Sequence, residues 1–135
     1  MKTKRSDLDW ILNSLASEIP QITDIVVLSA DGLRIAAWGK DRDVADRLAA
    51  ACAGLRSLGS AISSELPGSN RQMKLVVVEM DAGMFYLMEA AAGSYLAVLS
   101  HEGLDPGLLG ARMRDLVARI GEHLVSPPRY DGQTA

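Results

Sequence analysis

Three apolar segments follow one another closely between Gln72 and Ser100, and this spacing restricts the fold more than any other feature of the chain. The segments are Gln72 to Met80, Met84 to Ala90 and Tyr95 to Ser100, joined by Asp81-Ala82-Gly83 and Ala91-Ala92-Gly93-Ser94. Parallel strands need a crossover of about a dozen residues or more, whereas a short turn is enough for antiparallel strands. The sequence therefore predicts a three-stranded antiparallel meander.

A further pair of strands is predicted upstream. Ile25 to Leu28 is an unbroken apolar run, Asp31-Gly32 offers a tight turn, and Leu33 to Trp38 alternates in polarity. Two such runs around an Asp-Gly turn are typical of a β-hairpin.

Helices are predicted before, between and after these strands. Ser6 and Asp9 form a capping pattern before an apolar stripe that ends at Pro20. Asp43 and Asp46 repeat the pattern, and the helix they open ends at Leu66-Pro67-Gly68. Asp105-Pro106 opens the last helix. Its predicted buried stripe consists of Leu109, Met113, Leu116, Ile120 and Leu124.

The order of the predicted elements is helix, two strands, helix, three strands, helix. This order indicates an α+β fold in which one antiparallel sheet lies between helical layers. With 135 residues, the chain has the length of one domain. We assign residues 1–125 to that domain and residues 126–135, which begin Ser-Pro-Pro, to a flexible tail.

The second helix carries two different stripes when its residues are placed at about 100° steps. A leucine face is expected to pack on the sheet; it comprises Leu48, Ala51, Cys52, Leu55, Leu58, Ile62 and Leu66. A small stripe with almost no bulk lies about a third of a turn away; it comprises Ala50, Gly54, Ser57, Ala61 and Ser64. Alanine is a good helix former, so the stripe can be ordinary surface. Gly54 and Gly59 each cost about 1 kcal/mol relative to alanine, which favours close approach of another backbone.

The strand from Met73 to Met80 supports the same idea. Val76 and Val78 point to one face while Leu75 and Val77 point to the other, so both faces need cover. If the strand lies at the margin of the sheet, its free backbone groups can pair with a second chain, because only Lys74 and Glu79 oppose pairing.

Composition and charge argue against several partners. The chain is 48% apolar and 23% charged with a formal net charge of −3, which is typical of a globular protein. We expect no nucleic acid partner, because no basic face with interleaved aromatic residues is present. The apolar runs are too short or too charged for membrane insertion, and the basic start precedes no signal-peptide core. One cysteine allows no internal disulfide, so we expect a cytoplasmic protein.

Motifs for catalysis, cofactors or metals are not found. Gly103 to Gly110 lacks the lysine of a phosphate-binding loop, and His101 and His123 have no second ligand at metal spacing. Cys52 is expected to be a buried, inert thiol. Glu79 and Glu89 are expected to be separate strand charges. We therefore predict no catalytic residue, no cofactor and no metal.

Both tryptophans, Trp10 and Trp38, are expected to be partly buried packing groups. The alternative for Trp38 is an exposed side chain beside Gly39 that anchors a partner.

Five segments together resemble the bacterial single-domain branch of the Roadblock family, which is related to dynein light chains of the roadblock type. They are LDWILNSL, VVLSADGLRIAAWG, RDVADRLAAACAGLRSLGSAI, VVVEMDAGMFYLMEAAAGSYLAVL and LGARMRDLVARIGEHL, in this order. The resemblance covers Leu8 to Leu124 and implies a Roadblock/longin, profilin-like sandwich. Its five-stranded sheet has the order 2-1-5-4-3, which places Met73 to Met80 at an edge.

The resemblance also implies a function. Family members dimerise by pairing this edge strand and laying the two second helices side by side, and they regulate or scaffold small Ras-like GTPases without catalysis. They are often encoded with such a GTPase and a sensor-kinase-like protein. We therefore expect a homodimeric GTPase regulator or scaffold in bacterial signalling; the alternatives are a small-ligand-sensing module and a purely structural assembly module.

Two residue sets follow from this expectation. The predicted dimer interface comprises Ala50, Gly54, Ser57, Ala61, Ser64, Lys74, Val76 and Val78. The predicted partner-binding cations are Arg47, Arg56 and Arg71.

Overall fold

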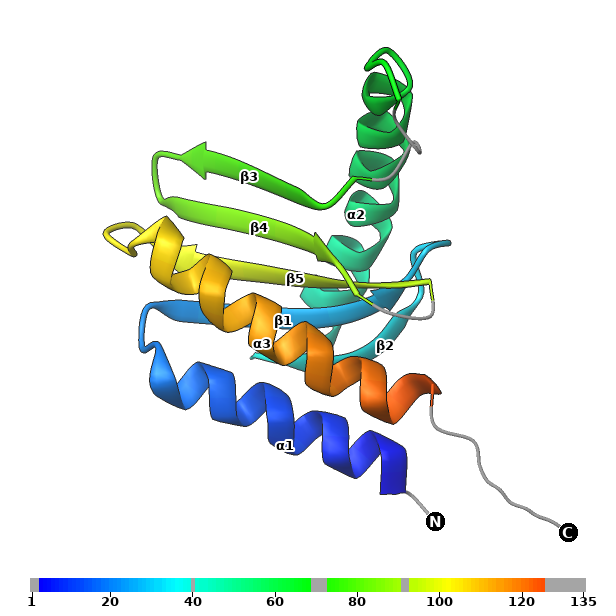
Figure 1. Ribbon diagram of the computed structural model, residues 1–135. Coiled ribbons are helices and arrows are strands. Elements are labelled where there is room, and N and C mark those ends of the chain that lie inside the picture. The colour runs from blue at the N-terminus through cyan, green and yellow to red at the C-terminus, as the bar shows by residue number, and fades with distance from the viewer. Residues whose placement is uncertain (1–2, 40, 69–72, 91–92, 126–135) are drawn as a thin grey trace, which may run out of the picture.

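The computed structural model describes residues 3–39, 41–68, 73–90 and 93–125. Within these residues the chain forms three helices and five strands (Figure 1). In chain order they are α1 (Thr3–Glu18), β1 (Ile22–Ser29), β2 (Arg34–Trp38), α2 (Arg42–Ser63), β3 (Leu75–Met80), β4 (Gly83–Glu89), β5 (Ser94–His101) and α3 (Pro106–Val125). The tail at 126–135 and Gln72, the expected first residue of β3, lie outside the described residues.

The strands form one sheet in the order β2-β1-β5-β4-β3. All four neighbouring pairs are antiparallel. Both the hairpin and the meander predicted from the sequence are confirmed, as is the expected strand order. β3 and β2 are the edge strands, so each has a neighbour on one side only.

Helices cover both faces of the sheet. α1 and α3 lie side by side on one face, while α2 crosses the other and extends past β3 at its C-terminal end (Figure 1). The first buried cluster joins α1 and α3 to the sheet through residues such as Leu12, Tyr86 and Met113. The second joins α2 to the opposite face through residues such as Cys52 and Leu87.

Two expected helix starts differ from the structure. α1 begins at Thr3, so the pattern of Ser6 and Asp9 lies inside the helix and does not mark its start. α2 is capped by Asp41, not by Asp43 or Asp46: the Asp41 carboxylate accepts a hydrogen bond of 2.9 Å from the backbone N–H of Asp43. Asp41 has extended backbone angles, which place its side chain over the first free N–H groups.

The start of α3 agrees with the sequence. The Asp105 carboxylate accepts a 3.0 Å hydrogen bond from the backbone N–H of Gly107, which fixes the helix just after β5. Leu109, Met113, Leu116 and Ile120 are buried as expected, whereas the Leu124 side chain lies outside the described part.

Candidate interaction surface

The side of α2 that contacts the sheet consists of small residues. Its fully buried positions are Ala45, Ala49 and Cys52. These residues recur at intervals of four and three, so they form one stripe along the helix. Because the stripe is small, the helix backbone lies close to the strands beneath it.

The expectation that the whole leucine face packs on the sheet is therefore wrong. Leu48 and Leu55 are partly buried against the second cluster. Ala51 is exposed. Leu58, Ile62 and Leu66 are 63%, 69% and 62% exposed. The leucines are rotated away from the centre of the buried stripe, and the C-terminal half of α2 extends beyond the strands that could cover them (Figure 1).

Leu58 and Ile62 of α2, together with Leu66 just past its C-terminal end, are here called the exposed flank. Leu58 and Ile62 lie on the side of α2 toward β3. The opposite side of α2 faces the β1–β2 turn and carries Ala53. A Cβ atom added to Gly32 of that turn would lie 3.2 Å from the Cβ atom of Ala53. Ile62 is about 180° around the helix from Ala53. Met73, which leads into β3, passes so close to Gly59 that a Cβ there would be 2.7 Å from its sulfur.

β3 continues this apolar surface at the sheet edge. Val76 and Val78 pack on the α2 side against the second cluster, while Leu75 and Val77 point to the other face and are partly exposed. The alternation predicted from the sequence is confirmed. Lys74 lies just before the strand and is exposed.

The small stripe is adjacent to the exposed flank. All five of its residues are exposed, namely Ala50, Gly54, Ser57, Ala61 and Ser64. A Cβ added to Gly54 meets nothing within 4 Å. Gly54 and Ala61 are about 40° and 60° around the helix from Leu58, so flank and stripe together form one broad surface.

Of the predicted partner-binding arginines, the two that the structure describes, Arg47 and Arg56, do not share a surface. Arg47 is exposed near the start of α2. Arg56 is on the sheet-facing side, where its buried Nε has no hydrogen-bond partner among the described residues. Arg71 lies outside the described residues.

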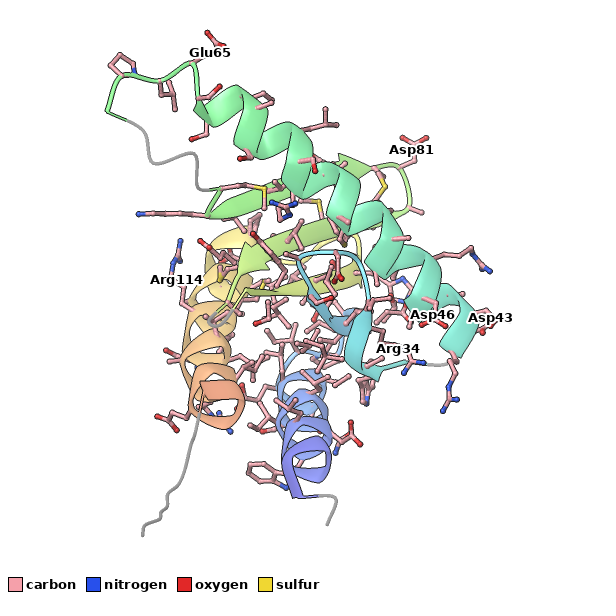
Figure 2. All side chains as sticks on the ribbon, turned by 90° about the vertical axis from the view of Figure 1, so that its right-hand side faces the viewer. Arg34, Asp43, Asp46, Glu65, Asp81 and Arg114 are labelled. Atoms are coloured by element: carbon pink, nitrogen blue, oxygen red, sulfur yellow. The ribbon has the colours of Figure 1, made fainter. Side chains whose placement is uncertain are left out.

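Sequence reasoning missed an ion pair at the N-terminal end of α2. The Arg34 Nε lies 2.7 Å from the Asp46 carboxylate, which joins β2 to the helix (Figure 2). A hollow of about 260 Å³ lies beside it and is lined partly by Asp24, Arg34 and Arg42. Arg34 is the first residue of β2, and Asp46 lies in the second turn of α2. Nothing in the sequence indicates that these two residues pair, because β2 and α2 come together only in the folded chain.

Cys52 has the properties expected of an inert thiol. Its side chain is 1% exposed, and burial raises its pKa from 9.0 to about 11. A thiol held neutral in this way is a poor nucleophile.

The other candidate groups are separated. Glu79 and Glu89 occupy opposite ends of the β3–β4 hairpin. Among the described residues, no three His, Cys, Asp or Glu side chains gather closely enough to hold a metal ion. No helix in the described part is long and apolar enough to cross a membrane.

The two tryptophans differ. Trp10 is 65% exposed, contrary to expectation, with the Arg119 guanidinium 6.0 Å from its ring centre. It lies on the outer side of α1, away from the stripe that packs on the sheet. Trp38 is partly buried as expected, and its Nε1 donates a 3.2 Å hydrogen bond to Asn13.

Comparisons with known proteins agree with this fold. The family model of the Roadblock/LC7 domain matches residues 8–100. No curated protein sequence gives a significant match. A Roadblock/LC7 domain from Streptomyces avermitilis is 35% identical, with a TM-score of 0.82; the match covers 87% of this chain and 98% of that one.

Two more distant structures share the fold. MglB from Myxococcus xanthus is 14% identical with a TM-score of 0.80, over 93% of this chain and 92% of that one. The gliding protein MglB from Thermus thermophilus is 16% identical with a TM-score of 0.79, over 90% of each chain. The family model spans more than half of the sequence, and the Streptomyces domain matches above 30% identity. The chain belongs to the Roadblock/LC7 domain family.

Proposed function

We propose that this chain is a non-catalytic homodimer that regulates or scaffolds a small Ras-like GTPase. The observation that carries the proposal is the exposed flank of α2 beside the unpaired edge of β3. Exposed large apolar side chains that gather on one surface are typical of protein interfaces. The Roadblock resemblance supplies the expected kind of partner.

In the proposed dimer, the β3 strands of two protomers pair edge to edge and the two α2 helices lie side by side. Strand pairing satisfies the free backbone groups of β3. The exposed flank supplies apolar contact area, and Gly54 and Ala61 of the adjacent small stripe allow the helices to approach closely. Lys74, Val76 and Val78 belong to the same proposed interface.

The GTPase would bind the outer surface of the paired α2 helices. Arg47 is exposed there and is a candidate contact, as is Arg71 in the segment outside the described residues. Arg56 is a weaker candidate, because it faces the sheet. A sensor-kinase-like protein is a further proposed partner.

The experiment that tests this function is an affinity purification from native cell extract with either GDP or a non-hydrolysable GTP analogue present. We expect recovery of a small GTPase with one of the two nucleotides, identified by mass spectrometry. A variant with Arg47→Glu is expected to recover less of it. Repeated purification without any GTPase in either nucleotide state contradicts the proposal.

A further inference from the structure

The helical layer formed by α1 and α3 leaves part of its face of the sheet uncovered. α3 lies over the middle of the sheet, and no helix of the described chain follows it across β3 (Figure 1). On this face β3 presents Leu75 and Val77, which are 37% and 44% exposed. They pair with Met88 and Tyr86 of β4, whose side chains are buried beneath the edge of α3.

A trough runs along this uncovered strip between β3 and α3. Its hollow has a volume of about 310 Å³, and its lining residues are Lys74, Leu75, Met88, Glu89, Arg114 and Val117. The side of α3 that faces the trough also carries Gly110 and Gly121, both buried. Arg114 is the one long side chain on this side of α3 among these residues, and its guanidinium lies beside Gly110. Toward Val117 and Gly121 the side chains are small, so another backbone can approach α3 closely there.

The two ends of the trough have opposite charge. Lys74 and Arg114 lie at one end, where Glu89 offsets only one of the two cations. Arg114 extends from α3 toward β3 (Figure 2). Neither Lys74 nor Arg114 forms an ion pair with another described residue. The trough is therefore cationic at this end.

Glu79 and Asp105 lie beyond the lining of the hollow, toward the C-terminal end of β3, where both act on Tyr86 of the neighbouring strand. The Tyr86 hydroxyl is buried there without a hydrogen-bond partner among the described residues. Its pKa is raised, first by burial and then by the negative charges of Asp105 and Glu79. The negative charges of Asp105 and Glu79 therefore both act on the Tyr86 hydroxyl.

The floor of the trough consists of side chains, because the free backbone edge of β3 lies in the plane of the sheet and not on this face. A segment bound in the trough therefore has to satisfy its own backbone hydrogen bonds. A helix does this, whereas an extended segment does not. From Lys74 to Glu79 the strand spans roughly 17 Å, which matches about 11 residues of α-helix.

We propose that the trough binds an amphipathic helix of a partner protein, with acidic side chains at Lys74 and Arg114 and basic side chains at Glu79 and Asp105. Such a helix would lie beside α3 and complete the helical layer over β3. The trough is on the face of β3 opposite α2. It therefore stays open when β3 pairs at its edge, and the proposal does not depend on the dimer.

The test uses designed three-turn helical peptides with a leucine stripe and NMR of the Leu, Val and Met methyl groups. The first peptide is bipolar, with glutamates in its first turn and lysines in its last turn. The second carries lysines in both turns. We expect the bipolar peptide to shift the methyl resonances of Leu75, Val77 and Val117 and to bind about tenfold more tightly than the dibasic peptide.

Two substitutions and one control sharpen the test. Val77→Asp replaces an exposed apolar side chain of the trough with a carboxylate and is expected to abolish the shifts. Arg114→Glu makes both ends acidic and is expected to reverse the preference, so that the dibasic peptide binds more tightly. Leu33→Asp, at a 66% exposed position in the β1–β2 turn, is expected to leave binding unchanged.

Several results would overturn the proposal. One is the absence of shifts at millimolar peptide; another is binding that neither Val77→Asp nor Arg114→Glu changes. If deletion of residues 126–135 moves the same resonances without peptide, the trough belongs to the chain's own C-terminal segment. If the resonances move with protein concentration alone, it belongs to a second copy.

Discussion

At the scale of single residues, the burial of the Cys52 thiol makes the stability of the protein depend on pH. Its thiol has a pKa of about 11 in the folded chain against an ordinary value of 9.0. Folding therefore favours the protonated thiol. The associated stability is fully present below pH 9 and is lost as the pH rises toward 11.

We predict that the free energy of unfolding falls less steeply between pH 9 and 11 in Cys52→Ala than in the parent. Chemical denaturation across this range measures the difference. In the folded parent the thiol should also react slowly with a thiol reagent below pH 9 and rapidly once the chain is denatured. Equal slopes in the two proteins contradict the assigned burial effect.

Gly83 is fixed by close approach, because a Cβ at this position would overlap the backbone carbonyl oxygen of Ser100 in β5. We predict that Gly83→Ala destabilises the protein by roughly 2–4 kcal/mol, since backbone cannot move aside as a flexible side chain can. Gly107→Ala is the control, because its nearest contact is 3.5 Å away and ordinary. Thermal unfolding compares the two variants. If both lose the same stability, the close contact between β4 and β5 is not the cause of the destabilisation.

At the scale of elements, the buried side of α2 consists of small side chains, and its exposed side carries large apolar side chains. This arrangement reverses the usual expectation that leucines mark the side facing the core. The spacing of the leucines indicated their common direction correctly, yet it does not say which stripe meets the sheet. The decisive signal was Ala45, Ala49 and Cys52, whose small size suits the close approach of a helix to a sheet.

Adjacent positions in α2 should therefore respond differently to the same substitution. We predict that Leu55→Arg lowers the free energy of unfolding by about 2–4 kcal/mol, because it places an unpaired charge against the second cluster. Gly54→Arg should keep the fold, because Gly54 faces open space. Circular dichroism with chemical denaturation compares them, and an unfolded Gly54→Arg chain is the outcome that contradicts this account.

At the scale of the whole molecule, the order of elements and short turns were enough to predict the sheet. Asp31-Gly32 and Asp81-Ala82-Gly83 forced antiparallel neighbours, and the resemblance supplied the strand order that the structure confirms. Contacts between distant segments were not predictable. Arg34 and Asp46 carry no distinctive signal along the chain, and the exposure of Trp10 depends on how α1 rests beside α3.

The interaction surface was predictable only in part. The edge position of β3 and the exposure of the small stripe agree with the sequence-based expectation. The exposure of Leu58 and Ile62 was missed, because apolar side chains at helical spacing suit a core and an interface equally well. Only the extent of the sheet beneath α2 distinguishes these two roles.

Sedimentation velocity at micromolar concentration tests the central claim, that the exposed flank of α2 and the edge of β3 form the dimer interface. We predict that the parent sediments as a dimer, and that Leu58→Arg and Ala61→Arg sediment as folded monomers. Leu33→Arg should remain dimeric, because this equally exposed leucine lies in the β1–β2 turn, which packs on the side of α2 opposite to the exposed flank. A monomeric parent, or flank variants that dimerise as tightly as the parent, would contradict the account.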